Sequence, residues 1–171
     1  MNEGLLLIRL VLGLLMAAHG AQKAFGWFGG HGLSGTAVFF EGLGFRPGRF
    51  FAATAAWAEI VSGLLMSLGF LGPVGPALMV SVMIVAAISV HWKNGLFASA
   101  GGIEMSLLYG AVAAGLTLTP PGRYSLDAIF GLTSLWTPTT AWLALGLGIV
   151  GGILNLLLRR PAPAAVEVAT A

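Results

Sequence analysis

The sequence contains no cysteine and very few charged residues. Among its 171 residues are 8 basic and 6 acidic side chains, and charged residues make up only 8% of the chain. The absence of cysteine excludes disulfides, cysteine-ligated iron–sulfur clusters, c-type haem attachment and thiol redox chemistry. Soluble domains carry about 25% charged residues, so this chain has too little polar side chain to cover a surface that faces water. The net charge of +2 is also too small for the basic patch of a nucleic-acid binder.

Hydrophobic residues are abundant: they make up 57% of the sequence and gather in long runs. A membrane-spanning helix needs about 20 mostly apolar residues, and five segments come close to that length. We therefore predict an all-α integral membrane protein with five spans, followed by a disordered tail over residues 161–171, where no periodicity is present. The predicted spans cover residues 4–25, 50–70, 76–93, 102–119 and 141–158.

Two segments near the N-terminus need interpretation. A signal peptide begins with a basic region, but only Glu3 is charged before the first apolar run, so we expect a retained span. Residues 26–49 form a long connection to the second span, in which Leu33, Ala37 and Phe40 fall on one helical face. This pattern suits a short helix in the membrane interface, and an ordinary loop that folds over the bundle fits it equally well.

Basic residues are distributed unevenly between the two ends of the predicted spans. Only Arg9 and Arg123 lie toward the end that carries the N-terminus. Because basic residues concentrate on the cytoplasmic side of membrane proteins, we predict an N-terminus outside and a C-terminus in the cytoplasm. The basic residues that lie toward the predicted cytoplasmic end are Lys23, Arg46, Arg49, Lys93, Arg159 and Arg160.

Five ionisable side chains from four predicted spans share one half of the membrane. A charge inside a span costs at least ~2.5–3.5 kcal/mol on insertion scales, so it normally faces water or a partner. At 1.5 Å per residue, Glu59 lies about 13 Å from the cytoplasmic end of its span. His19 and Lys23 lie near the matching end of the first span, His91 closes the third span and Glu104 opens the fourth. We predict that these side chains form one polar site.

The helical faces support this prediction. His19 and Lys23 are four residues apart and therefore adjacent on one helix surface. Glu59 has small neighbours that let helices approach closely, so its carboxylate is expected to point into the bundle. Alternatively, Glu59 pairs with Lys23 or His19 only to fix the helix register, and His91 is an ordinary interfacial residue. The residues that share the stripe of Glu59 are Ala52, Ala56, Gly63 and Met66.

A smaller polar set lies at the opposite end of the spans. Arg9 is placed just beneath the loop formed by residues 120–138, which contains Asp127. An Arg9–Asp127 pair would clamp this loop to the bundle, so we predict a structural polar pair there.

Five stretches of the sequence carry a resemblance: HGAQKAFG (19–26), the span around Glu59, the helix end at His91, GGIEMSLL (101–108) and PPGRYSLD (120–127). Together they resemble the DoxX family of small bacterial membrane proteins, and the resemblance covers about residues 4–131. The family is named for its similarity to a subunit of an archaeal terminal quinol oxidase and thiosulfate:quinone oxidoreductase, and other members are associated with oxidative-stress membrane complexes. The matching positions are Arg9, His19, Lys23, Glu59, His91, Glu104 and Asp127.

The resemblance implies a four-helix transmembrane bundle over residues 1–131 in a bacterial inner membrane. Residues 132–160 then form an additional fifth C-terminal span, which extends the bundle or serves as a docking surface. Three small residues in that span form a face suited to helix packing, namely Ala144, Gly148 and Gly152.

The expected function is that of a quinone-linked oxidoreductase component that acts with partner subunits. A quinone head group needs hydrogen bonds to its two oxygens and a proton route for its reduction. The sequence has no Rossmann glycine fingerprint, so a flavin or any further cofactor is expected on a partner. The expected partners are membrane lipid and other subunits of a redox complex, and nucleic acid is not expected. The expected catalytic residues are His19, Lys23, Glu59, His91 and Glu104, and the quinone-binding residues are His19, Lys23 and Trp57.

Two other functions compete with this expectation. His19 and His91 offer axial ligands for haem or a metal, but the Glu-x-x-His pairs of a ferritin-like di-iron site are absent, so we expect neither group. A non-catalytic membrane anchor or assembly subunit remains open, and it predicts that Glu59 and His19 tolerate substitution. A transporter would show repeats or interrupted helices, and we find no such symmetry.

Overall fold

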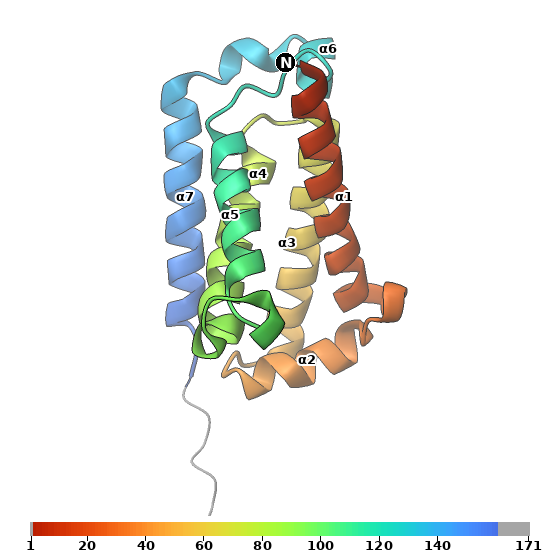
Figure 1. Ribbon diagram of the computed structural model, residues 1–171, viewed down its shortest axis with the longest axis vertical. Coiled ribbons are helices and arrows are strands. Elements are labelled where there is room, and N and C mark those ends of the chain that lie inside the picture. The colour runs from red at the N-terminus through yellow and green to blue at the C-terminus, as the bar shows by residue number, and fades with distance from the viewer. Residues whose placement is uncertain (1, 161–171) are drawn as a thin grey trace, which may run out of the picture.

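The computed structural model describes residues 2–160, and this part of the chain consists of helices and turns without a strand (Figure 1). Four of its helical stretches are long and apolar enough to cross a membrane, the third being Val74–Asn94. The prediction of an all-α membrane bundle is therefore confirmed. The tail predicted over residues 161–171 lies outside the described residues. The α-helices are α1 (Asn2–Phe25), α2 (Gly32–Gly42), α3 (Gly48–Leu68), α4 (Val74–Ala86), α5 (Glu104–Thr117), α6 (Leu126–Ile129) and α7 (Pro138–Leu157).

The fourth of the predicted spans is shorter than expected. α5 has 14 residues, which gives about 21 Å at 1.5 Å per residue, whereas a bilayer core is about 30 Å thick. Residues 95–103 do not extend this helix because they form a turn, in which Gly95 and Gly101 have φ values of +81° and +75° and Ile103 donates to the carbonyl of Gly95. α5 still runs beside α4 and α7, so the bundle is formed by five helices of unequal length (Figure 1).

Small residues allow α1 and α3 to approach closely. A Cβ atom at Gly20 would lie 2.5 Å from the carbonyl oxygen of Ala56, and Gly13 and Gly63 face each other's helix with equally little space. In a bilayer, where lipid is as apolar as leucine, such close backbone packing is a main source of helix association. The close contact between α1 and α3 therefore fixes the positions of the side chains that these two helices direct at each other.

α7 docks on α4 through the small-residue face that the sequence predicts. A Cβ atom at Gly148 would collide with the backbone of Ala77, and one at Gly152 would lie 3.0 Å from Cβ of Ile84. Gly146, on another face of the same helix, has open space within 4 Å. The C-terminal helix thus packs on α4 and extends the bundle.

The connection between the first two spans contains a helix. α2 lies across one end of the bundle, roughly perpendicular to the spans (Figure 1). Phe40 on α2 packs with Phe45 and Phe51 in a buried aromatic cluster, with ring centroids 5.7 Å and 5.3 Å apart along the series. Of the two alternatives for this connection, the chain therefore forms the short helix, and it covers the end of the bundle.

Arg9 and Asp127 are both buried at the opposite end, but they bond backbone groups rather than each other. The guanidinium of Arg9 donates to the carbonyls of Met66 and Ser67 in the last turn of α3, and to those of Pro121 and Tyr124 in the loop between α5 and α6. Because the last carbonyls of a helix lack intrahelical partners, they attract such a donor. The carboxylate of Asp127 accepts from the amides of Leu71 and Gly72 at 3.0 Å and 2.6 Å. The loop is therefore fastened to the bundle without the direct pair that we expected.

Candidate functional site

The centre of the site is a buried ion pair between α1 and α3. Nζ of Lys23 lies 2.5 Å from Oε2 of Glu59, and the side chains are 29% and 6% exposed, respectively. α1 and α3 run antiparallel, since Gly13 contacts Gly63 and Gly20 contacts Ala56, so Lys23 and Glu59 lie on opposite sides of the Gly20–Ala56 contact and the long lysine side chain spans the offset between them. Replacing a buried ion pair by apolar residues is often neutral or stabilising, so its presence is weak support for a purely structural role.

Two cavities meet at this ion pair. Cavity A lies between α2, α3, α4 and α7 and has a volume of about 300 Å³. Cavity B lies between α1, α4 and α5 and has a volume of about 360 Å³. The lining of both includes Lys23, Glu59, Ala86 and His91, so the ion pair forms part of the wall between them.

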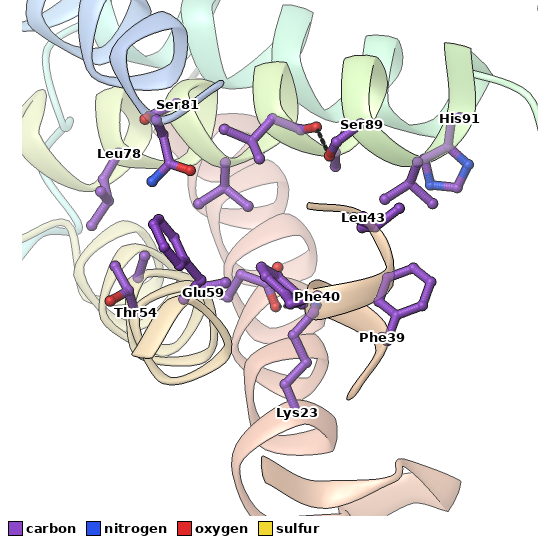
Figure 2. Close-up of a pocket in the computed structure, with 18 residues that line it drawn as sticks. Lys23, Phe39, Phe40, Leu43, Thr54, Glu59, Leu78, Ser81, Ser89 and His91 are labelled. Carbon is purple, nitrogen blue, oxygen red and sulfur yellow. Dashed lines mark hydrogen bonds and ion pairs between the residues drawn. The ribbon is translucent and has the colours of Figure 1, made fainter. Parts of the chain in front are cut away.

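Cavity A is long and mainly apolar. Its lining along α4 extends from Leu78 to His91, which is about 20 Å of helix. Phe39 and Phe40 of α2 and Phe51 of α3 supply aromatic surface. In Figure 2, Leu78 and Ser81 of α4 and Ser89 and His91 of the π-helical turn lie across the cavity from Lys23 and Glu59. Its polar lining residues are Lys23, Thr54, Glu59, Ser81, Ser89, His91 and Asn155.

His91 is held by an irregular end of the third span. α4 continues into a π-helical turn over Ala87–His91, and such turns occur frequently at functional sites. Nδ1 of His91 lies 2.7 Å from the carbonyl oxygen of Gly101 in the turn before α5. A carbonyl only accepts, so Nδ1 of His91 is the donor in this contact.

His19 belongs to cavity B rather than to the ion pair. Its Nδ1 lies 3.2 Å from Oε1 of Gln22, and its ring meets the ring of Tyr109 edge-on with centroids 6.5 Å apart. His19, Tyr109 and His91 all line cavity B. Cavity B therefore presents three groups that can exchange protons, of which His91 also lines cavity A.

Glu104 does not join the other four ionisable groups. It is exposed at the start of α5, and its Oε2 accepts a hydrogen bond of 2.7 Å from the amide of Ala98. It lines neither cavity A nor cavity B. The carboxylate instead accepts a backbone N–H group of the turn that precedes α5, so the structure brings together four of the five predicted side chains.

Trp57 also lies away from the site. Its side chain is 54% exposed and packs edge-on against Phe25, with ring centroids 6.1 Å apart. It lines neither cavity. The reason is helix geometry, because a residue two positions before Glu59 is rotated by about 200° around α3 and points out of the bundle.

Several lining residues were missed by the sequence analysis. Tyr109 and Ser106 enter cavity B from α5, and Asn155 enters cavity A from α7. A lone amide within an otherwise apolar span is a signal that could have identified Asn155. Ser81 and Ser89 carry no such signal, because serine is common in membrane helices.

The chemistry available at the site is hydrogen bonding and proton exchange. Within residues 2–160, no three histidine or acidic side chains are grouped as a metal ion would require. Lys23 and Glu59 form a donor and an acceptor at the junction of the cavities, with His91 at the edge of both. The arrangement can bind a polar head group beside a long apolar chamber.

Comparison with known proteins matches one family, DoxX, over residues 4–92. No curated protein and no solved structure matches the chain. The matched stretch runs from α1 to the end of the π-helical turn and contains His19, Lys23, Glu59 and His91. It is shorter than the resemblance over residues 4–131, and it leaves α5, α6 and α7 outside. Since the family model matches more than half of the sequence, the chain belongs to the DoxX family.

Proposed function

We propose that this DoxX-family membrane protein binds a quinone in cavity A and acts, with partner subunits, as the quinone-linked component of an oxidoreductase. The observation that carries the proposal is the position of the Lys23–Glu59 pair. It joins a long apolar cavity with aromatic walls to a second cavity that holds His19, Tyr109 and His91. Binding sites for small lipophilic molecules typically combine such apolar walls with a few polar groups.

The requirements of quinone chemistry agree with this arrangement. Reduction of a quinone to its quinol takes up two electrons and two protons. The ammonium of Lys23 donates hydrogen bonds to a carbonyl oxygen, and Glu59 is in direct contact with it for proton exchange. The histidines and Tyr109 of cavity B offer a route for protons to the ion pair. The electrons come from a partner subunit that carries a redox group such as a flavin.

One observation favours the role of a membrane anchor or assembly subunit instead. Lys23 and Glu59 contact each other directly, so both charges are already neutralised within the protein. A pair that only fixes the register of α1 against α3 would have the same geometry. The two functions differ in what happens when both charges are removed together.

The test is ligand-dependent thermal stabilisation of the purified protein in detergent. We expect the Tm of the wild type to rise with the concentration of a decyl-benzoquinone, because a ligand that binds the native state stabilises it by mass action. The double variant Lys23→Met/Glu59→Leu should fold but lose this rise, since it keeps apolar volume and removes both polar groups.

Lys93→Met is the matched control, because it removes an exposed positive charge that lines neither cavity. Its Tm should rise with ligand as in the wild type. A constant Tm of folded wild-type protein across all quinone concentrations would contradict the proposal and favour the anchor.

A further inference from the structure

α7 brings one polar side chain into cavity A. Asn155 is the only residue between Ala141 and Leu158 that carries an amide, a hydroxyl or a charge. The remainder of that stretch is glycine, alanine, tryptophan and aliphatic residues, and α7 is apolar enough to cross a membrane. A polar side chain in such a helix normally faces the protein interior and has a partner there. Asn155 does face the interior, because it lines cavity A.

The side chain of Asn155 makes no hydrogen bond within the described part of the chain. Other polar lining groups do: the hydroxyl of Thr54 donates to the carbonyl of Phe50 at 2.9 Å, and that of Ser89 to the carbonyl of Val85 at 2.5 Å. A carboxamide has two N–H donors and one acceptor oxygen. Leaving it unpaired in apolar surroundings is unfavourable, so a group that enters the cavity gains by bonding to it.

The hydroxyl of Ser81 on α4 lies opposite the face of α7 that carries this amide. A Cβ atom at Gly151 would lie 3.4 Å from Oγ of Ser81, and Asn155 is one turn beyond Gly151 on the same face of α7. Ser81 faces the cavity from α4 (Figure 2). Cavity A therefore has two polar regions. The neutral side chains of Ser81 and Asn155 lie where α4 and α7 meet, and the charged side chains of Lys23 and Glu59 come from α1 and α3.

We propose that Asn155 binds one carbonyl oxygen of the ligand head group, while Lys23 binds the other, so that α7 determines which lipophilic head groups cavity A accepts. This inference rests on the proposed function. The amide and the ammonium are both donors, and they match a flat head group with two acceptor oxygens joined to a long apolar tail. The apolar and aromatic lining of the cavity then receives the ring and the tail.

The experiment compares two ligands on the full-length protein in detergent by isothermal titration calorimetry. One ligand is a decyl-benzoquinone, and the other is decylbenzene, which has the same tail without oxygens. Asn155→Leu should weaken binding of the quinone by roughly three- to tenfold, as expected for one neutral hydrogen bond. Its affinity for decylbenzene should stay unchanged, and Asn155→Gln should recover part of the quinone affinity because it restores an amide.

Leu154→Ala is the matched control, because Leu154 is the neighbouring residue, lies 56% exposed and is absent from the cavity lining. Its affinity for the quinone should equal that of the wild type. Unchanged quinone binding in Asn155→Leu, or an equal loss for both ligands, would overturn the role of Asn155 while leaving the proposed function intact. Failure of the wild type to bind the quinone would overturn both. Asn155→Ala serves the same comparison if the leucine variant does not fold.

Discussion

At the scale of single residues, the two members of the ion pair are unequal. Glu59 is almost fully buried, whereas nearly a third of the Lys23 side chain is exposed and its long stem allows the ammonium to reach toward the membrane surface. Removing the partner of a buried charge leaves that charge uncompensated, and this is the costly change. The consequence is an asymmetry between the two single substitutions.

Lys23→Met is expected to destabilise the protein by about 3–5 kcal/mol, because it leaves the Glu59 carboxylate buried without a partner. Glu59→Leu should cost clearly less, because Lys23 can turn toward water. The double variant should lie within about 1 kcal/mol of the wild type, since it buries no unpaired charge. Unfolding in detergent measures all three. Equal losses for the two single variants would show that exposure does not govern the pair.

Arg9→Lys is a second test at this scale. The guanidinium donates to four carbonyls, two from α3 and two from the loop between α5 and α6, and an ammonium cannot reproduce this planar fork. We expect a loss of about 2–3 kcal/mol of stability in an unfolding experiment. Arg123→Lys, at an exposed position at the same end, should stay within about 0.5 kcal/mol of the wild type.

These residues also show what sequence reasoning can and cannot reach. The positions of Lys23 and Glu59 followed from depth and helical face, because both are fixed by residue spacing. The outward direction of Trp57 was predictable in the same way, because two residues of helix rotate it by about 200° from Glu59. The partners of Arg9 were not, because unpaired carbonyls at a helix end are invisible in a list of side chains.

At the scale of helices, packing of α7 against α4 depends on two glycines. Gly148→Leu should destabilise the protein by at least about 1–3 kcal/mol, because its side chain would collide with the backbone of Ala77. Gly146→Leu is the matched control on the same helix and should be neutral, since nothing lies within 4 Å. Thermal unfolding of the two variants gives the comparison, and similar Tm values would contradict the close contact.

The helices themselves were predictable to different degrees. Long apolar runs predicted α1, α3 and α7, and small residues predicted packing faces on α3 and α7 without indicating which helices they contact. The ends of α5 were predicted two residues too far out, because the sequence alone does not show that residues 102 and 103 belong to the preceding turn and that the helix ends at Thr117. The π-helical turn that ends at His91 likewise has no signature in the local sequence.

At the scale of the whole molecule, the bundle has two chemically different ends. The N-terminus and α6 lie at one end, and α2 and the last turn of α7 lie at the other (Figure 1). The amide of Arg160 donates to the carbonyl of Gly44, so the basic end of α7 is fastened next to α2. The orientation in the membrane remains a prediction from the distribution of basic residues, with the end that carries α2 in the cytoplasm.

The lack of cysteine makes this orientation testable by labelling. In intact bacterial cells, a membrane-impermeant thiol reagent should label Ser134→Cys, near α6, and should not label Ser99→Cys until the cells are opened. Both positions are exposed, so accessibility of the side chain does not distinguish them. The opposite labelling pattern would show that the protein is inserted the other way round.

The ion pair that borders both cavities also limits how the protein can be dissected. Lys23 and Glu59 each line both compartments, so any change at either residue alters both compartments at once. The phenotype of such a variant therefore does not distinguish a loss of ligand binding in cavity A from a loss of proton transfer through cavity B. Phe51 and Tyr109, which each line a single compartment, allow the two to be perturbed separately.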